Sequence, residues 1–108
     1  MPTAYQILGQ AAPATSSNLF TVPSAQNYIV STLVIANTTT SASTVRVHAR
    51  VGGAAAATSN AVVYDASIPA NSTVSFTLGM TFTATDILTV VAGTSGALTA
   101  TAFGSIIS

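Results

Sequence analysis

The stretch YIVSTLVIAN, residues 28–37, decides the fold class of this chain. Apolar side chains occupy both of its alternating faces, and only Ser31 and Thr32 interrupt them before the closing Asn37. Residues such as Val, Ile and Tyr suit a pleated strand, and a strand that is apolar on both faces is typical of the interior of a sheet. We therefore expect residues 28–37 to form a central strand that is covered on both sides.

Two neighbouring stretches predict a hairpin. TVRVHARV, residues 44–51, alternates strictly, and NAVVYDASIP, residues 60–69, continues the pattern after a loop of small residues. On an extended strand every second side chain points to the same face. The expected inner faces consist of Val45, Val47, Ala49 and Val51 on the first strand and of Val62, Tyr64, Ala66 and Ile68 on the second. The expected outer faces consist of Thr44, Arg46, His48 and Arg50, and of Val63, Asp65 and Ser67.

The charges of this hairpin predict its register. One register that keeps both inner faces together sets Asp65 directly opposite Arg46, and such an exposed pair contributes about 0.2–1 kcal/mol. His48 and Arg50 then have no acid on the hairpin. We therefore expect the outward row of Arg46, His48 and Arg50 to hold the residues that contact a partner. The other pairs in this register are Val45 with Ala66, Val47 with Tyr64, His48 with Val63, and Arg50 with Ala61.

Short strands of the same kind fill the rest of the chain, because prolines and glycines separate segments rich in Val, Ile, Thr, Tyr and Phe. We predict strands near residues 4–8, 18–22, 28–36, 44–51, 61–68, 73–78, 80–84, 86–92 and 97–103. Several short strands at this spacing are typical of sandwiches and barrels. The predicted fold is all-β, a single antiparallel β-sandwich of jelly-roll or related topology.

The first 26 residues differ from the rest. AAPATSS, residues 11–17, is small, polar and interrupted by proline, so it cannot bury enough surface to order itself. We expect residues 1–26 to supply an N-terminal strand and an arm-like segment with contacts outside its own core. Residues 27–108 are expected to form the sandwich body, and the whole chain is one domain.

The composition excludes several functions. Only 4% of the 108 residues are charged, against about 25% in an average soluble protein, and the net charge is zero. No basic surface is available to neutralise nucleic-acid phosphates. Cys is absent, which excludes disulfides and cysteine zinc sites. The start has no signal-peptide pattern, and no apolar run approaches the 18 or so residues of a membrane span, so we expect cytoplasmic synthesis and no membrane insertion.

The few reactive side chains predict neither an enzyme nor a cofactor or metal site. His48 and Asp65 can be combined with a Ser on paper, but the chain lacks the G-x-S-x-G motif of many Ser-dependent hydrolases. Asp65 and Asp86 are the only carboxylates available for glycoside hydrolysis, and together with His48 they match no zinc or calcium spacing. We expect Asp86 to end a turn before the strand ILTVVA.

The aromatic residues are spread about one per strand, which favours a role as core residues. A carbohydrate-binding module, by contrast, needs two or three of them on one exposed face. That class of protein is the alternative outside structural proteins. The residues concerned are Tyr5, Phe20, Tyr28, Tyr64, Phe76, Phe82 and Phe103.

The shortage of charge favours a protein that is packed in an assembly. Ala, Ser and Thr make up 51 of the 108 residues, so the surface must be largely hydroxyl-rich and apolar. A freely diffusing domain usually has about 25–35% charged residues on its surface. We therefore expect a homo-oligomeric building block rather than a monomeric enzyme.

Five segments carry a resemblance to a group of small virion proteins of tailed bacteriophages, and they cover nearly the whole chain. In that group an LGQ…LYTVP start leads into a sheet strand that ends in Asn, and an IPAN turn and a hairpin with TD and AG precede a last strand with FG. The segments are YQILGQAAPATSSNLFTVP, YIVSTLVIANTTT, VRVHARV, IPANSTVSFTLG and TATDILTVVAGTSGALTATAFGSII.

Proteins of this group resemble capsid cement (decoration) proteins, which are small β-sandwiches that assemble as trimers on the phage head. The resemblance therefore implies a non-enzymatic virion protein that clamps neighbouring capsid subunits. Its expected partners are copies of itself, most simply in a trimer, and the major capsid protein or another virion protein. The same motifs resemble minor tail or baseplate proteins, so that location stays open.

Overall fold

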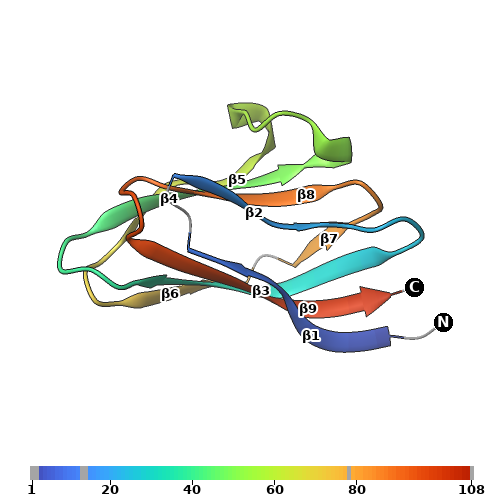
Figure 1. Ribbon diagram of the computed structural model, residues 1–108, viewed down its shortest axis with the longest axis horizontal. Helices are drawn as coiled ribbons and strands as arrows, with labels where there is room; N and C mark the ends of the chain where they lie inside the picture. Colours follow the sequence, from blue (N-terminus) through green and yellow to red (C-terminus); the bar gives the residue numbers. More distant parts are fainter. Residues whose placement is uncertain (1–2, 13–14, 78, 108) are drawn as a thin grey trace.

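Strand β3 (Asn27–Asn37) lies in the middle of a sheet, as its sequence predicts (Figure 1). The structure, a computed structural model, describes residues 3–12, 15–77 and 79–107. Sheet A has the strand order β1 (Thr3–Ala11), β9 (Leu98–Ile107), β3 and β6 (Thr73–Phe76), and β7 (Met80–Phe82) also pairs with β3. Every pairing in this sheet is antiparallel.

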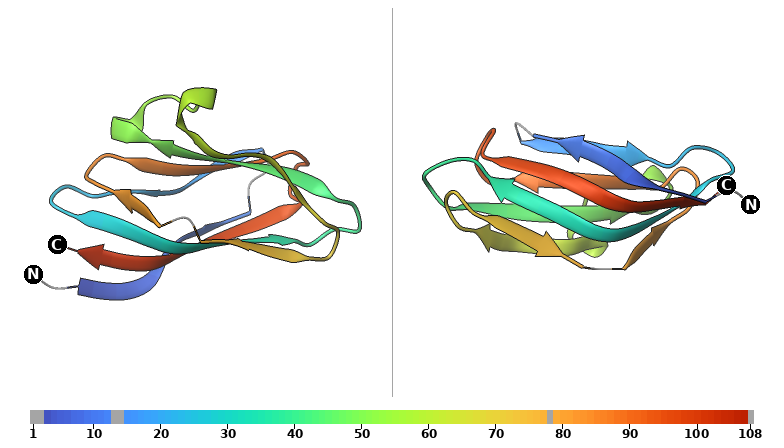
Figure 2. Two further views of the ribbon diagram at one scale, coloured as in Figure 1. Left: turned by 180° about the vertical axis from the view of Figure 1, so that it is seen from behind. Right: turned by 90° about the horizontal axis from the view of Figure 1, so that it is seen from below.

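Sheet B packs against sheet A and completes the predicted sandwich (Figures 1 and 2). Its strand order is β2 (Ser16–Thr21), β8 (Ile87–Ala92), β4 (Ser43–Arg50) and β5 (Ala61–Ile68), again antiparallel. Two short 3-10 turns, η1 (Val51–Gly53) and η2 (Thr58–Asn60), lie between β4 and β5.

The path of the chain is that of a jelly roll. The chain changes sheet at each connection except the β4–β5 hairpin and the short break between β6 and β7. If β6 and β7 are taken as one interrupted strand, the described residues form two four-stranded sheets in jelly-roll order. The all-β prediction and the jelly-roll topology are therefore confirmed.

Aliphatic side chains from both sheets fill the core. Leu33 and Ile35 of β3 pack among Val45, Leu88 and Leu98, and none of these five has any exposed surface. Full burial of such a side chain contributes about 1.5–3 kcal/mol. Three aromatic rings close one end of the core, since Phe20 lies 4.9 Å from Tyr28 and 5.1 Å from Phe82 between ring centroids.

The predicted register of the β4–β5 hairpin is right at one end and wrong at the other. Val45 pairs with Ala66 as expected, but beyond Asp65 the register shifts. Asp65 has a φ of 53°, a conformation that Asp tolerates better than most residues, and the resulting bulge inserts an extra residue into β5. A second register shift, between Val47 and His48 of β4, inserts another residue into β5. Past the bulge at Asp65 the two faces exchange, so Val63 turns inward and Tyr64 turns outward.

The shifted register corrects several predicted positions. Val47 pairs with Val63 instead of Tyr64, and His48 pairs with Ala61 instead of Val63. Val62, expected on the inner face, is exposed. Val51 was expected to face inward too, but β4 ends at Arg50 and the chain turns outward into η1.

The outer face of β3 corrects another expectation. The inward side chains of this strand are covered by sheet B, whereas Ile29 and Val34 on the other side lie half-buried on the open face of sheet A. Within the described residues, no second layer covers that face. The described residues also contain no helix of the length and apolar character needed to cross a membrane.

The N-terminal segment supplies an edge strand to each sheet. β1 pairs with β9, and β2 pairs with β8. The two strands meet at Gly9, where a side chain would strike the backbone of Leu19. The prediction of an irregular segment over residues 11–17 is wrong at its ends, because Ala11 belongs to β1 and Ser16 and Ser17 belong to β2; residues 13–14 lie outside the described residues. The expected arm-like contact with a neighbour stays a prediction.

Asn37 joins the two sheets at a corner of the sandwich. Its side chain is buried, and its Nδ2 donates to the carbonyls of Ser41 at 2.9 Å and Ile68 at 3.1 Å. Its Oδ1 accepts from the backbone N–H of Thr39 at 2.9 Å and from the Thr39 hydroxyl at 2.8 Å. One amide thus holds the β3–β4 connection against the end of β5.

Asn37→Ala is expected to lower the free energy of unfolding by about 1–3 kcal/mol, because it leaves buried backbone groups without partners. Urea unfolding measures the change. Asn27→Ala, at an exposed position of the same strand, is the matched control and should stay within about 0.5 kcal/mol. Equal losses in the two variants would contradict the role of Asn37.

Candidate functional site

Arg46 and Asp65 form the predicted ion pair on the outer side of sheet B. Arg46 Nε donates to Asp65 Oδ1 at 2.7 Å, and the second guanidinium nitrogen donates to Oδ2 at 3.1 Å. The guanidinium also lies 4.2 Å from the centre of the Tyr64 ring, which the bulge has turned outward. The hydrogen bond from Arg46 lowers the pKa of Asp65, partly opposed by desolvation. The pair is therefore confirmed, although the strands reach it through a bulge.

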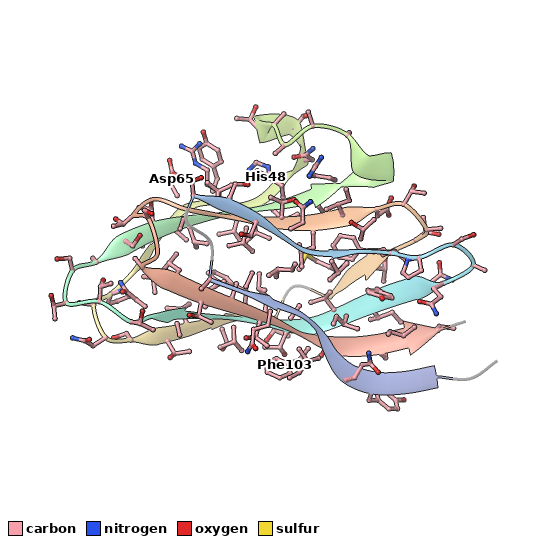
Figure 3. All side chains as sticks on the ribbon, viewed as in Figure 1. His48, Asp65 and Phe103 are labelled. Atoms are coloured by element: carbon pink, nitrogen blue, oxygen red, sulfur yellow. The ribbon has the colours of Figure 1, made fainter. Side chains whose placement is uncertain are left out.

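His48 is buried, although its strand position faces outward (Figure 3). The loop between β4 and β5 folds over it, and its Nδ1 lies 2.9 Å from Asn60 Oδ1 and 3.1 Å from the Ala57 carbonyl. Both partners are acceptors, so Nδ1 carries the hydrogen. Asn60 also accepts from the Ala57 N–H and donates to the Ala55 carbonyl, which fixes the loop in this place.

All three guanidinium nitrogens of Arg50 donate to neutral oxygens. Its Nε donates to the Ala54 carbonyl at 2.6 Å, and a terminal nitrogen donates to the Gly53 carbonyl at 3.2 Å. The other terminal nitrogen reaches Asn18 Oδ1 and Thr89 Oγ1, both at 3.2 Å. Arg50 thus ties the loop to β2 and β8.

The row of Arg46, His48 and Arg50 is therefore engaged within its own chain. His48 is only 5% exposed. The side chains of Arg46 and Asp65 are 41% and 47% exposed, so nearly half of each is accessible to solvent. A partner can reach the two arginines more readily than the imidazole. Contact between this row and another protein stays a prediction.

The remaining acid, Asp86, has a structural role. It is buried, and its two carboxylate oxygens accept from the backbone N–H groups of Gly52 at 2.8 Å and Thr83 at 3.0 Å. Asp65 binds Arg46, whereas His48 contacts the loop, so these two side chains do not form a Ser/His/Asp triad. In the described part of the chain, no three His, Cys, Asp or Glu side chains come together as a metal site.

A hollow lies on the outer face of sheet A, and we call it the apolar hollow. Its volume is about 480 Å³. Tyr5 is 85% exposed, Ile7 51% and Phe103 39%, and Figure 3 shows Phe103 pointing away from sheet B. The hollow is lined by Tyr5, Gln6, Ile7, Ile29, Ser31, Phe103, Gly104 and Ser105.

Three neighbouring strands build this hollow. Tyr5 of β1 and Ile29 of β3 both pair with Ser105 of β9, and Phe103 pairs with Ile7. Ser31, the extra residue of a bulge in β3, donates its hydroxyl to the Phe103 carbonyl at 3.1 Å. Gly104 also lines the hollow, and a side chain at this position would strike the Ile29 carbonyl.

The hollow corrects the expectation that the aromatic residues fill the core. Phe20, Tyr28 and Phe82 are core residues as predicted. Tyr5, Tyr64 and Phe103 are exposed, and Tyr5 and Phe103 share one face. Alternation along β9 contains the missed signal, because Leu98, Ala100 and Ala102 all point inward and Phe103 must then point outward.

Comparison with known proteins adds one solved structure. No model of a known protein family matches the chain, and no curated protein sequence matches it. The fold is similar to that of a chain described as "Structure of infectious bursal disease virus Gx strain", with a TM-score of 0.52 and 16% sequence identity. The match covers 97% of this chain but 31% of the viral one, so this chain spans about a third of its length. At this identity the likeness shows a shared fold.

The two outer surfaces of the sandwich differ in charge. The ion pair and Arg50 belong to the hairpin of sheet B, and Asp86 lies in the turn before β8. Among the described residues of sheet A, no side chain is charged. The apolar hollow therefore lies on an uncharged face, opposite the face that carries the cationic row.

The coupling between Arg46 and Asp65 is expected to depend on pH. The folded pKa of Asp65 lies below the unfolded value of about 3.9, so the pair stabilises fully above that value and stops doing so as pH falls through the folded pKa. A double-mutant cycle of Arg46→Gln and Asp65→Asn, followed by urea unfolding, measures the coupling. It should be favourable at neutral pH and vanish in strong acid. A coupling that persists unchanged in acid would contradict the assignment.

Proposed function

We propose that this chain is a non-enzymatic structural protein of a virion, and specifically a capsid decoration protein that clamps neighbouring capsid subunits. The observation that carries the proposal is the uncharged outer face of sheet A, with its exposed Tyr5, Ile7 and Phe103. Faces of this kind are typical of surfaces that other proteins cover. The jelly-roll likeness to a chain in a virus structure supports a role in a virion.

The proposed assembly uses both surfaces. Copies of the chain associate with one another, in a trimer, and the trimer binds the major capsid protein or another virion protein. The side of sheet B with Arg46, His48 and Arg50 is proposed to face that partner, with contact through the arginines. The protein is proposed to be made in the host cytoplasm and to act in the virion, without nucleic acid, membrane or cofactor.

Two alternatives follow from other features. A tail or baseplate component needs the same neutral, assembling surface, so it differs from the decoration protein only in location. A carbohydrate-binding module is favoured by one specific observation, the presence of Tyr5 and Phe103 on the same exposed face beside Gln6 and Ser31. Stacking on aromatic rings next to a few polar groups suits a small ligand.

Imaging of virions tests the location. Particles should be purified from cells in which the native viral genome supplies the chain, and single-particle reconstruction should locate its density. We expect copies at regular positions on the capsid surface. Density confined to the tail or baseplate would replace the decoration role by the first alternative, and absence from purified particles would contradict a virion protein altogether.

A glycan array tests the carbohydrate alternative. The proposed function predicts no saturable glycan binding by the purified wild-type protein. Binding that is lost in Tyr5→Ala and retained in Tyr64→Ala, the matched tyrosine on the other sheet, would favour the module and contradict the structural role of the hollow.

A further inference from the structure

We propose that the apolar hollow is the surface through which copies of this chain bind one another, with the same hollow of a second copy as its occupant. This inference rests on the self-association in the proposed function and names the residues of one contact between two copies. Two copies that meet through the same patch are related by a twofold axis, so this contact forms a dimer and is distinct from the proposed trimer. The hollow is proposed to lie at that axis.

The first argument comes from β3. Its sequence is apolar on both faces, a pattern typical of strands with a layer on each side. Sheet B supplies one layer, over Val30, Leu33 and Ile35. Ile29 and Val34 point the other way and remain half-buried on the open face. A second copy supplies the layer that a single chain lacks.

The second argument is the kind of residue exposed. Tyr5, Ile7 and Phe103 are large, largely or partly exposed, and adjacent across two paired strands. Buried tyrosines and other aromatic residues provide much of the binding energy in protein interfaces. Association removes these side chains from water, and the hollow gives them room to interdigitate.

The third argument is charge complementarity. A partner with charged groups at this place would lose their hydration, and the described residues of sheet A offer no opposite charge in return. The same face of a second copy is uncharged as well. Its hydroxyl and amide groups, such as those of Ser31 and Gln6, can pair with one another across the contact.

The fourth argument is the edge of β1. Within the described residues, the other edges of the two sheets are protected in ways that discourage pairing with another chain. β5 has a bulge and an ion pair, and β6 and β7 are short and interrupted. β2 has its own bulge and meets β1 at Gly9. β1 has a bulge at Leu8, but residues 5–7 before it pair regularly with β9, and their side chains are exposed on both faces.

The available area is sufficient. The molecule extends 45 Å along the strands and 19 Å across each sheet, as the layering in Figure 1 shows. A face of that size can supply the roughly 800 Å² that each partner contributes to a standard interface. Figure 2 shows the start of β1 and the end of β9 at one end of the sandwich, so the hollow lies off-centre on this face.

Sedimentation velocity over a range of concentrations tests the inference. The wild-type chain should form an oligomer at micromolar concentration, and the double variant Tyr5→Lys, Ile7→Lys should weaken its association at least 100-fold. The matched control is Val62→Lys, Tyr64→Lys, an exposed apolar pair on sheet B, which should associate as the wild type does. Urea unfolding verifies that both variants remain folded.

A second measurement avoids charged substitutions. A photo-crosslinking amino acid at position 5, in an otherwise unchanged chain, should join two copies through residues near the hollow, such as Ile7, Ile29 or Phe103. Crosslinks confined to sheet B would overturn the inference, as would a wild-type monomer or a sheet A variant that still assembles. A variant that assembles normally but no longer binds purified capsids would assign the hollow to the capsid, which overturns this inference and leaves the proposed function standing.

Discussion

Only four residues of this chain are charged, and all four lie on the side of the sandwich that includes sheet B. Arg46 and Asp65 neutralise each other, Arg50 holds the η1 loop to β2 and β8, and Asp86 fastens the same loop to the turn before β8. These contacts shape one surface of the molecule. They leave the opposite surface, on sheet A, with only hydroxyl, amide and apolar groups.

This division has a physical consequence. The core between the sheets supplies the stability of the fold, and it does so without help from sheet A's outer face. Exposure of Tyr5 and Phe103 on that face therefore contributes little to the stability of the single chain. Burial of the same side chains against a second uncharged surface is favourable, so assembly explains why the hollow exposes them.

Much of the fold could be predicted from the sequence, because strand formation here depends on local patterns. Alternation and β-branched residues located the strands, and the central position of β3 followed from its two apolar faces. The faces of β5 could not be predicted, because a bulge at Asp65 exchanges them and leaves no reliable trace in the sequence. His48 is buried because the loop that contains Asn60 folds over it. The alternation of residues along a strand does not predict such a contact with a loop. The Arg46–Asp65 pair was predictable because it requires only that the two strands be neighbours.

The central claim is that the outer face of sheet A is covered when the protein assembles. Amide hydrogen exchange over residues 3–7 of β1 tests it most directly, at those amides that point away from β9 and are open in the single chain. The account predicts slow exchange in the concentrated, assembled protein and fast exchange after dilution to the monomer, with β4 and β8 protected in both. Exchange at residues 3–7 that is equally fast in the assembled and the diluted protein would contradict it.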